Sequence, residues 1–248
     1  MSTDLFTFGE ALSVFIASDS DSVMSAQKYE RVTAGAELNV AVTLSRLGLK
    51  SQYFSRFGND QLGSVMLADI EAEGVDISLV KRVDSFTGAM VRNSGKSQVV
   101  EISYLRKGSA ASTIEPQDIL DSYISSAKWL HTTGITCAIS TTGAATVKYA
   151  LSKAASLAIK SSFDLNIRRR LWSEADAKKV LAPLASNIEL LIGGEDEYQV
   201  VFGSNEPKKI LAEANKRGCR IAVMTKGDQM IRYSIDGDYA EINPPKVV

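Results

Sequence analysis

Two short segments of the chain place cations beside polar side chains at a spacing that could hold a negatively charged ligand. In the first, Asp164, Asn166 and Arg168 alternate, so an extended backbone puts all three on one side. In the second, Tyr104 and Arg106 would likewise share one face of a strand. An arginine at a strand end can grip a carboxylate or phosphate through two parallel hydrogen bonds. The plainer alternatives are a solvated basic turn for the first segment and an exposed cross-strand pair for the second.

The scarcity of histidine and cysteine excludes much of metal and nucleophile chemistry. The chain has one histidine, His131, inside an apolar run, and two cysteines, Cys137 and Cys219, without CxxC spacing. A Ser-His-Asp triad would have to use His131, and two lone cysteines cannot complete a zinc site. Any catalysis must therefore rely on carboxylates, arginine, lysine and backbone N–H groups. The cysteines are typical of buried, reduced thiols and of a cytosolic setting.

The composition is that of an ordinary globular protein. Among 248 residues, 28 are Lys or Arg, 29 are Asp or Glu, and 45% are hydrophobic. Because the net charge is near zero, no global basic field would hold nucleic acid or an acidic membrane, and we expect neither partner. The acidic start, Met1–Leu5, and the lack of a long apolar run argue against a signal peptide and a transmembrane helix. We therefore expect a cytoplasmic protein.

Short apolar strands alternate with amphipathic helices along most of the chain, which predicts an α/β fold. We expect strands over residues 51–57, 129–133, 162–165, 188–192 and 219–225, with helices over 142–159, 174–184, 195–201 and 207–217. Asp60 is a helix cap, and strands 230–233 and 239–242 pair around an Asp-Gly turn. Two segments, 13–34 and 80–107, are β-rich instead. The second predicts an antiparallel sheet of strands 80–83, 88–92 and 99–105, with a hairpin turn at 94–97.

The polar residues that follow the expected strands are the candidates for a ligand site. In an open parallel sheet, ligands bind beyond the carboxyl ends of the strands. The candidates are Glu10 and residues 59–60, 132–134, 164–166, 193–195 and 225–228. Any one of these residues alone could be present only because its residue type favours a turn. Neither a Walker motif nor GxGxxG occurs, so a nucleotide would bind in another manner.

Five segments occur in an order that is typical of one family. They are Gly9-Glu10, Gly35–Ala41, Phe57–Gly63, Tyr104–Ala110 and Asp164–Trp172. Over essentially its whole length the chain resembles the ribokinase-like (PfkB) sugar kinases, and within them it is most similar to 2-keto-3-deoxygluconate kinases. The resemblance implies one kinase domain over residues 1–248, a Rossmann-like αβα sandwich whose small β-sheet lid is formed by about 13–34 and 80–107. It implies ATP- and Mg²⁺-dependent phosphorylation of a sugar acid, 2-keto-3-deoxygluconate, to its 6-phosphate.

The resemblance also implies two groups of site residues. The sugar acid would be held by Gly35, Met90, Tyr104, Arg106 and Arg168. The nucleotide would be held by Asn166, Thr225, Lys226 and Gly227, with Glu197 acting on Mg²⁺. Two positions depart from the family pattern. Gly194 replaces the Asn of an N-x-x-E motif, and Met90 stands where the sugar-acid kinases often carry a tyrosine.

The family's GAGD segment, which carries the catalytic Asp base, normally follows a segment like Pro245–Val248. We therefore expect the base beyond Val248 and name no catalytic residue within 1–248. Two other functions stay open: a fructokinase or other ketose kinase, which needs no two cations facing its substrate, and a non-catalytic sugar-binding remnant that lacks GAGD. Lid strands of this family often pair between subunits, and exposed sheet edges favour pairing, so we expect a homo-oligomer, such as a dimer, through the lid.

Overall fold

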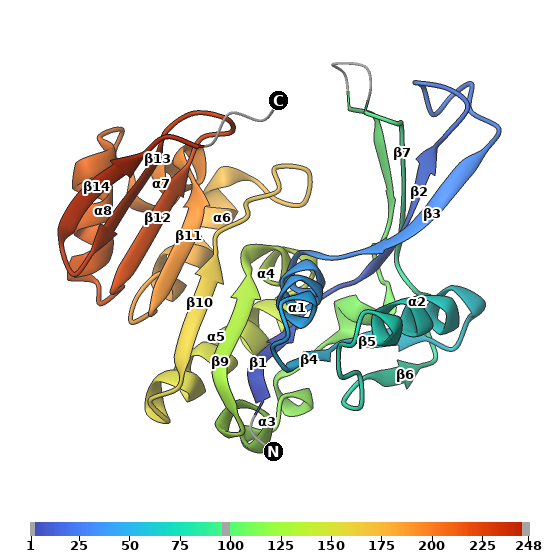
Figure 1. Ribbon diagram of the computed structural model, residues 1–248, viewed down its shortest axis with the longest axis horizontal. Coiled ribbons are helices and arrows are strands. Elements are labelled where there is room, and N and C mark those ends of the chain that lie inside the picture. Colours follow the sequence, from blue (N-terminus) through green and yellow to red (C-terminus); the bar gives the residue numbers. More distant parts are fainter. Residues whose placement is uncertain (1–2, 96–99, 245–248) are drawn as a thin grey trace. The chain divides into compact units, whose positions relative to one another are not determined.

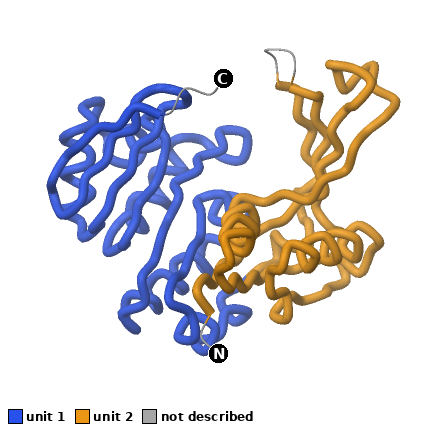
Figure 2. The backbone as a smooth tube through the Cα atoms, in the orientation of Figure 1, with its two compact units in different colours: residues 1–2, 115–248 blue, residues 3–114 orange. Residues whose placement is uncertain are grey.

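The computed structural model describes residues 3–95 and 100–244, which belong to two compact units. The N-terminal unit comprises Thr3–Ile114, and the C-terminal unit begins at Glu115 (Figure 2). The expected single kinase domain with inserted lid segments stays a prediction. In each unit, short strands and helices alternate along the chain, which confirms the predicted α/β class (Figure 1).

The N-terminal unit contains three sets of paired strands. Strand β1 (Thr3–Phe8) runs parallel to β4 (Ser51–Phe54), and helix α1 (Ala36–Arg46) packs on both. A four-stranded sheet, the lid sheet, has the order β3-β2-β7-β8. Its strands are β2 (Leu12–Ala17), β3 (Tyr29–Ala34), β7 (Ala89–Arg92) and β8 (Ile102–Leu105). Figure 2 shows these strands projecting from the rest of their unit.

The lid sheet differs from the prediction in one strand. Strands β7 and β8 are antiparallel, as expected, and β2 pairs in parallel with β7, a pairing for which no direction was predicted. Residues 81–83 form β6 (Lys81–Val83), which is not part of the lid sheet. It pairs in parallel with β5 (Arg56–Gly58). Helix α2 (Gln61–Ala72) connects β5 to β6, so the three elements form a βαβ crossover that the sequence pattern did not reveal. The expected turn at 94–97 lies partly outside the described residues.

Asp60 begins helix α2, as the sequence predicts, and also fixes the approach to the lid. Its Oδ1 accepts a hydrogen bond from the Gly63 N–H, and its Oδ2 accepts one from the Thr87 N–H, each at 2.7 Å. Burial alone would raise the pKa of this carboxyl, but the hydrogen bonds from Gly63 and Thr87 lower it. The cap therefore stays ionised and ties α2 to the chain that enters β7.

The C-terminal unit contains strands in the order β14-β13-β12-β11-β10-β9, with helices packed on them. The parallel strands are β9 (Ala127–Thr133), β10 (Lys160–Asp164), β11 (Leu190–Gly194) and β12 (Ile221–Thr225). Strands β13 (Ile231–Ile235) and β14 (Asp238–Ile242) form the expected hairpin. Its turn residues Asp236 and Gly237 both have positive φ, 52° and 97°, as a tight hairpin turn requires.

The helices of this unit mostly follow the predicted ranges. They are α3 (Asp121–Ser125), α4 (Gly134–Ile139), α5 (Thr141–Ser156), α6 (Glu174–Leu184), α7 (Glu195–Phe202) and α8 (Pro207–Lys216); 3-10 turns occur at Ala110–Thr113 in the N-terminal unit and at Pro116–Asp118. Helix α4 was not predicted, because it is short and follows β9 without a linker. No described helix has the length and apolar character needed to span a bilayer.

His131 lies in the core of the C-terminal unit. It is 4% exposed, and its Nδ1 lies 2.8 Å from the Ser162 hydroxyl, which also accepts a hydrogen bond from the Trp129 indole. Burial lowers the pKa of His131 to about 4, so the ring is neutral at physiological pH. These contacts assign His131 to core packing, in agreement with the exclusion of a histidine-based triad.

Candidate functional site

A buried ion pair joins the end of β1 to the end of β8 within the N-terminal unit. Glu10 follows β1 and is 3% exposed, while Arg106 follows β8 and is 9% exposed. The Arg106 guanidinium contacts Glu10 Oε2, and the Ser109 hydroxyl donates a 2.7 Å hydrogen bond to Glu10 Oε1. Charges are buried in proteins when they are paired and hydrogen-bonded, and this pair meets that requirement.

Arg106 is also fixed by the aromatic ring that precedes it. Its guanidinium carbon lies 5.3 Å from the centre of the Tyr104 ring, a cation–π geometry that confirms that the two side chains share a face. Tyr104 is paired with Met90 on β7, which is paired in turn with Val14 on β2. Val14, Met90 and Tyr104 therefore lie side by side in one row across the lid sheet. Because Arg106 packs on Tyr104, it lies close to this row as well.

One donor of Arg106 has no acceptor. The Nε atom is buried and makes no hydrogen bond with any residue in the described ranges, although Nη2 is engaged by Glu10. A guanidinium carries five N–H donors in a rigid fork, so Glu10 leaves capacity for a second oxygen acceptor. Burial raises the pKa of Glu10, and the Arg106 charge and the Ser109 hydroxyl oppose that rise. The buried Nε is therefore a candidate donor for an oxygen of a ligand.

Gly35 brings the start of α1 against the same strand end. A Cβ at Gly35 would lie 2.5 Å from the Glu10 carbonyl oxygen, so only glycine allows the backbones to approach this closely. The Gly35 N–H faces the Asn39 amide oxygen at 3.4 Å. The N-terminal unit therefore brings together four of the five predicted sugar-site residues, Gly35, Met90, Tyr104 and Arg106. The fifth, Arg168, belongs to the C-terminal unit, and its approach to the others stays a prediction.

In the C-terminal unit, three parallel strands end at one edge of the sheet. Asp164 on β10 pairs with Ile192 on β11, and Gly194 on β11 pairs with Thr225 on β12. The segments after these strands carry Asn166 and the turn 225–227, so the structure places the predicted nucleotide residues along this edge. Carboxyl ends of parallel strands are where open α/β sheets bind ligands.

In the loop after β10, buried and more exposed side chains alternate, as the sequence predicts. Leu165 and Ile167 are 0% and 5% exposed, whereas Arg168 is exposed to solvent. Asn166 adopts a positive φ of 38°, and its amide donates a 3.2 Å hydrogen bond to the Asp164 carboxylate. Asparagine tolerates the left-handed region better than most residues because its side chain bonds locally. The loop thus interrupts the extended strand while keeping Arg168 outward.

Two of the three consecutive arginines of this loop, Arg168 and Arg169, have different surroundings. Arg169 pairs with Glu174 and Asp196, each at 2.7 Å, which fits the predicted solvated basic turn. The Arg168 side chain makes no ion pair or hydrogen bond with the described residues 3–95 and 100–244. Arg168 therefore has its donors available for a ligand.

Glu197, at the start of helix α7, fixes the loop after β10 by a hydrogen bond. Its Oε1 accepts the Ile167 N–H and its Oε2 accepts the Gly194 N–H, each at 2.7 Å. Within the described part of the chain, no group of three or more His, Cys, Asp or Glu side chains is arranged to hold a metal ion. A Mg²⁺ ion in such a site would be held largely by nucleotide phosphates, as is usual for this cation.

A second carboxylate of α7, that of Glu195, contacts the turn after β12. Lys226 lies 3.1 Å from Glu195, whose other oxygen accepts a 2.7 Å hydrogen bond from Arg232. Gly227 has a φ of 56° and open space where a Cβ would stand. The Lys-Gly turn therefore exposes backbone and a lysine at the sheet edge, a combination suited to phosphate groups.

Comparison with known proteins identifies the family. The model of the pfkB family carbohydrate kinases matches residues 2–248. A 2-dehydro-3-deoxygluconokinase of Bacillus subtilis (strain 168) is 31% identical over 232 residues, which cover 92% of this chain and 72% of that protein. The chain belongs to the pfkB family of carbohydrate kinases. It is therefore a sugar kinase, an enzyme that transfers a phosphoryl group to a small-molecule sugar.

Solved structures show that the chain has the fold of this pfkB family. The crystal structure of a PfkB protein from Polaromonas sp. JS666 superimposes with a TM-score of 0.93 at 30% identity, covering 99% of this chain and 84% of that one. A ribokinase II of E. coli, solved with ATP and Mg²⁺, superimposes with a TM-score of 0.89 at 20% identity over 99% of this chain and 80% of that one. At 20% identity, the similarity to the E. coli structure shows a shared fold and no more.

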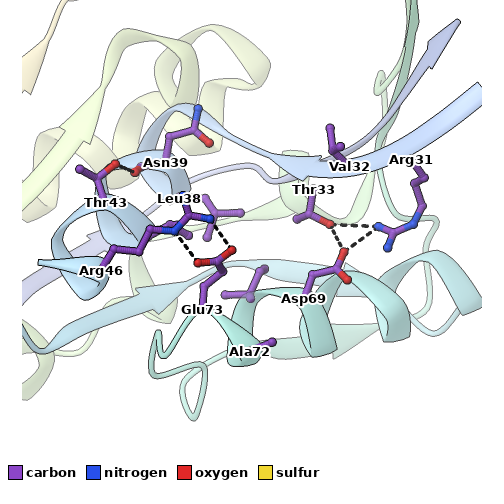
Figure 3. Close-up of a pocket in the computed structure, with 12 residues that line it drawn as sticks. Arg31, Val32, Thr33, Leu38, Asn39, Thr43, Arg46, Asp69, Ala72 and Glu73 are labelled. Atoms are coloured by element: carbon purple, nitrogen blue, oxygen red, sulfur yellow. Dashed lines mark hydrogen bonds and ion pairs between the residues drawn. The ribbon is translucent and has the colours of Figure 1, made fainter. Parts of the chain in front are cut away.

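A groove of the N-terminal unit is lined by neither Glu10 nor Arg106. It has a volume of about 590 Å³ and is bordered by β3, α1 and α2 (Figure 3). Arg31 pairs with Asp69 at 2.7 Å, and Arg46 pairs with Glu73. Since both arginines already have carboxylate partners, the groove offers no free cation, and the ion pairs serve to join β3 and α1 to α2.

Four contacts of the site were not predicted from the sequence. They are the pairing of Arg106 with Glu10, the Lys226–Glu195 contact, and the two hydrogen bonds to Glu197. The position of Glu10 directly after a buried strand was the available signal, since it placed this residue among the candidates. Except for the Gly194–Glu197 cap, whose residues are three positions apart, the partners of these groups come from distant segments, which local spacing does not reveal.

Proposed function

We propose that this pfkB kinase phosphorylates a sugar acid with ATP and Mg²⁺, and that the substrate is 2-keto-3-deoxygluconate, converted to its 6-phosphate. The observation that carries the proposal is the buried Arg106, whose Nε lacks an acceptor in the described part of the chain. A substrate carboxylate would satisfy this donor and add charge to the hydrogen bond. The similarity to the B. subtilis 2-dehydro-3-deoxygluconokinase supports the same substrate class.

In this proposal the sugar site has a charged end and a neutral end. Arg106 and Arg168 bind the carboxylate, because one has a buried donor to fill and the other has no partner among the described residues. Tyr104 and Met90 form the wall beside the carbon chain, and Gly35 leaves room for the sugar to approach the backbone. Two cations suit an anion and would be superfluous for a neutral ketose.

The nucleotide would lie along the edge of the C-terminal sheet. Asn166, Thr225, Lys226 and Gly227 are the residues that we propose hold ATP there. Mg²⁺ bound to the phosphates would neutralise charge that develops during phosphoryl transfer. We assign no catalytic base among residues 1–248.

We also propose that the protein is cytoplasmic and forms a homo-oligomer through the lid sheet. Both cysteines, Cys137 and Cys219, are buried and reduced, in keeping with a reducing compartment. The outer strands of the lid sheet are β3 and β8, where Val32 and Leu105 are exposed. Unpaired edge strands with apolar side chains favour association with a second copy.

The test is the ATP turnover of the full-length protein with 2-keto-3-deoxygluconate, its galacto epimer and fructose. We expect turnover to depend on a sugar acid, and we expect that acid to raise the melting temperature. Equal turnover with fructose would establish a ketose kinase instead. A rise in melting temperature without turnover of any substrate would establish a sugar-binding protein.

A further inference from the structure

The Glu197 side chain connects the β10 loop to the β11 end through two backbone hydrogen bonds at once. It lies in the first turn of α7, where its Oε2 caps the helix through the Gly194 N–H at 2.7 Å. Its Oε1 leaves the helix and accepts the Ile167 N–H, also at 2.7 Å. Both partners are donors, so the contact needs a group that only accepts hydrogen bonds. An ionised carboxylate meets this need, and an amide does not.

The Ile167 N–H lies between the two functional side chains of the loop. Asn166 precedes it and carries the positive φ of 38°, and Arg168 follows it. Ile167 itself is 5% exposed, so the hydrogen bond is shielded from water and stronger for it. The position of this one N–H therefore decides where both neighbours point.

We infer that Glu197 is a positioning residue, which fixes Asn166 for the nucleotide and Arg168 for the sugar acid, and is not a direct ligand of Mg²⁺. The inference rests on the proposed function for what the two neighbours bind. It differs from the metal role that the family resemblance implies. The structure offers no preformed metal site around Glu197: each of its carboxylate oxygens is already occupied by a backbone N–H group, and in the described ranges no group of three or more His, Cys, Asp or Glu side chains is arranged to hold a metal ion.

The test compares Glu197→Gln with a matched control in the same helical turn. Asp196→Asn removes the same charge from a side chain that is 58% exposed and that, among the described residues, bonds to the side chain of Arg169 alone. We expect Glu197→Gln to lower kcat/KM about a hundredfold, since displacements of about 1 Å in a site cost this much. The concentration of free Mg²⁺ that gives half-maximal activity should stay unchanged, and Asp196→Asn should stay within about twofold of the wild type.

Hydrogen exchange supplies a readout that needs neither substrate nor turnover. The Ile167 amide should exchange slowly in the wild type, with or without MgATP, and at least tenfold faster in Glu197→Gln. A wild-type amide that loses protection when MgATP is added, or a variant that needs more than tenfold more Mg²⁺, would overturn the inference. So would a Glu197→Gln protein that matches Asp196→Asn in every measurement.

The wild-type measurement keeps the inference testable if Glu197→Gln does not fold. The exchange result is also independent of substrate identity. If fructose proves to be the substrate, the proposed function fails while protection of Ile167 still reports on Glu197. If the sugar acid is confirmed and Ile167 is unprotected, only the positioning role fails.

Discussion

Replacing Arg106 by alanine is expected to lower kcat/KM for 2-keto-3-deoxygluconate by about thirtyfold to three-thousandfold. Removing one partner of a buried, hydrogen-bonded charge pair costs about 2–5 kcal/mol, and each 1.4 kcal/mol is about tenfold. The loss should fall on carboxylate substrates, while any slow turnover of fructose stays within about threefold. Steady-state kinetics with both substrates measures the difference.

Two further variants separate the binding role of Arg106 from its structural role. Arg106→Lys keeps a positive charge beside Glu10 but lacks the planar fork, so we expect an intermediate loss for the sugar acid. Arg46→Ala removes an arginine whose side chain is 66% exposed and pairs with Glu73, and it should leave both substrates unaffected. If Arg106→Ala lowers turnover of the acid and of fructose equally, Arg106 does not recognise a carboxylate.

Replacing Glu10 by alanine should cost about 3–5 kcal/mol of the free energy of unfolding, because it leaves the Arg106 charge buried without a counter-ion. The two side chains are 1% and 9% exposed, so water cannot replace the missing carboxylate. Chemical denaturation of the wild type and the variant gives the difference. Glu73→Ala is the matched control, since its pair with Arg46 is exposed and should contribute less than about 1 kcal/mol.

Glu10→Gln removes the charge of this group but keeps polar atoms beside Arg106 and Ser109, and its comparison with the wild type should reveal the titration of Glu10. Burial raises the pKa of Glu10, so at pH values between 4.5 and that raised pKa the folded protein holds a proton that the unfolded chain releases. The stabilisation is complete below the ordinary pKa of 4.5 and is lost as pH rises through the raised value. The wild type should therefore lose stability relative to Glu10→Gln over that range. A constant difference across this pH range would contradict the assignment.

The local features of the fold were predictable because short-range chemistry fixes them. The predicted range 174–184 matches α6, Asp60 caps α2, and the Asp236-Gly237 turn closes its hairpin. Each depends on residues within a few positions of one another. Strand β6 was assigned to the wrong sheet because three residues carry too little pattern to select between two edges.

In the candidate site, too, local features were predictable from the sequence and long-range contacts were not. Alternation along a strand was enough to place Tyr104 beside Arg106 and to separate Arg168 from the buried Leu165. The Glu10–Arg106 pair joins residues far apart in the sequence, and the Ile167–Glu197 hydrogen bond spans 30 positions. No local pattern specifies such partners. Arg106 and Arg168 belong to different units, so their shared ligand stays a prediction.

A crystal structure of the full-length protein with 2-keto-3-deoxygluconate tests the central claim most directly. Oxygens of one carboxylate are expected to accept hydrogen bonds from the guanidinium groups of both Arg106 and Arg168. A sugar acid whose carboxylate contacts neither group, with the two arginines facing separate regions of solvent, would contradict it.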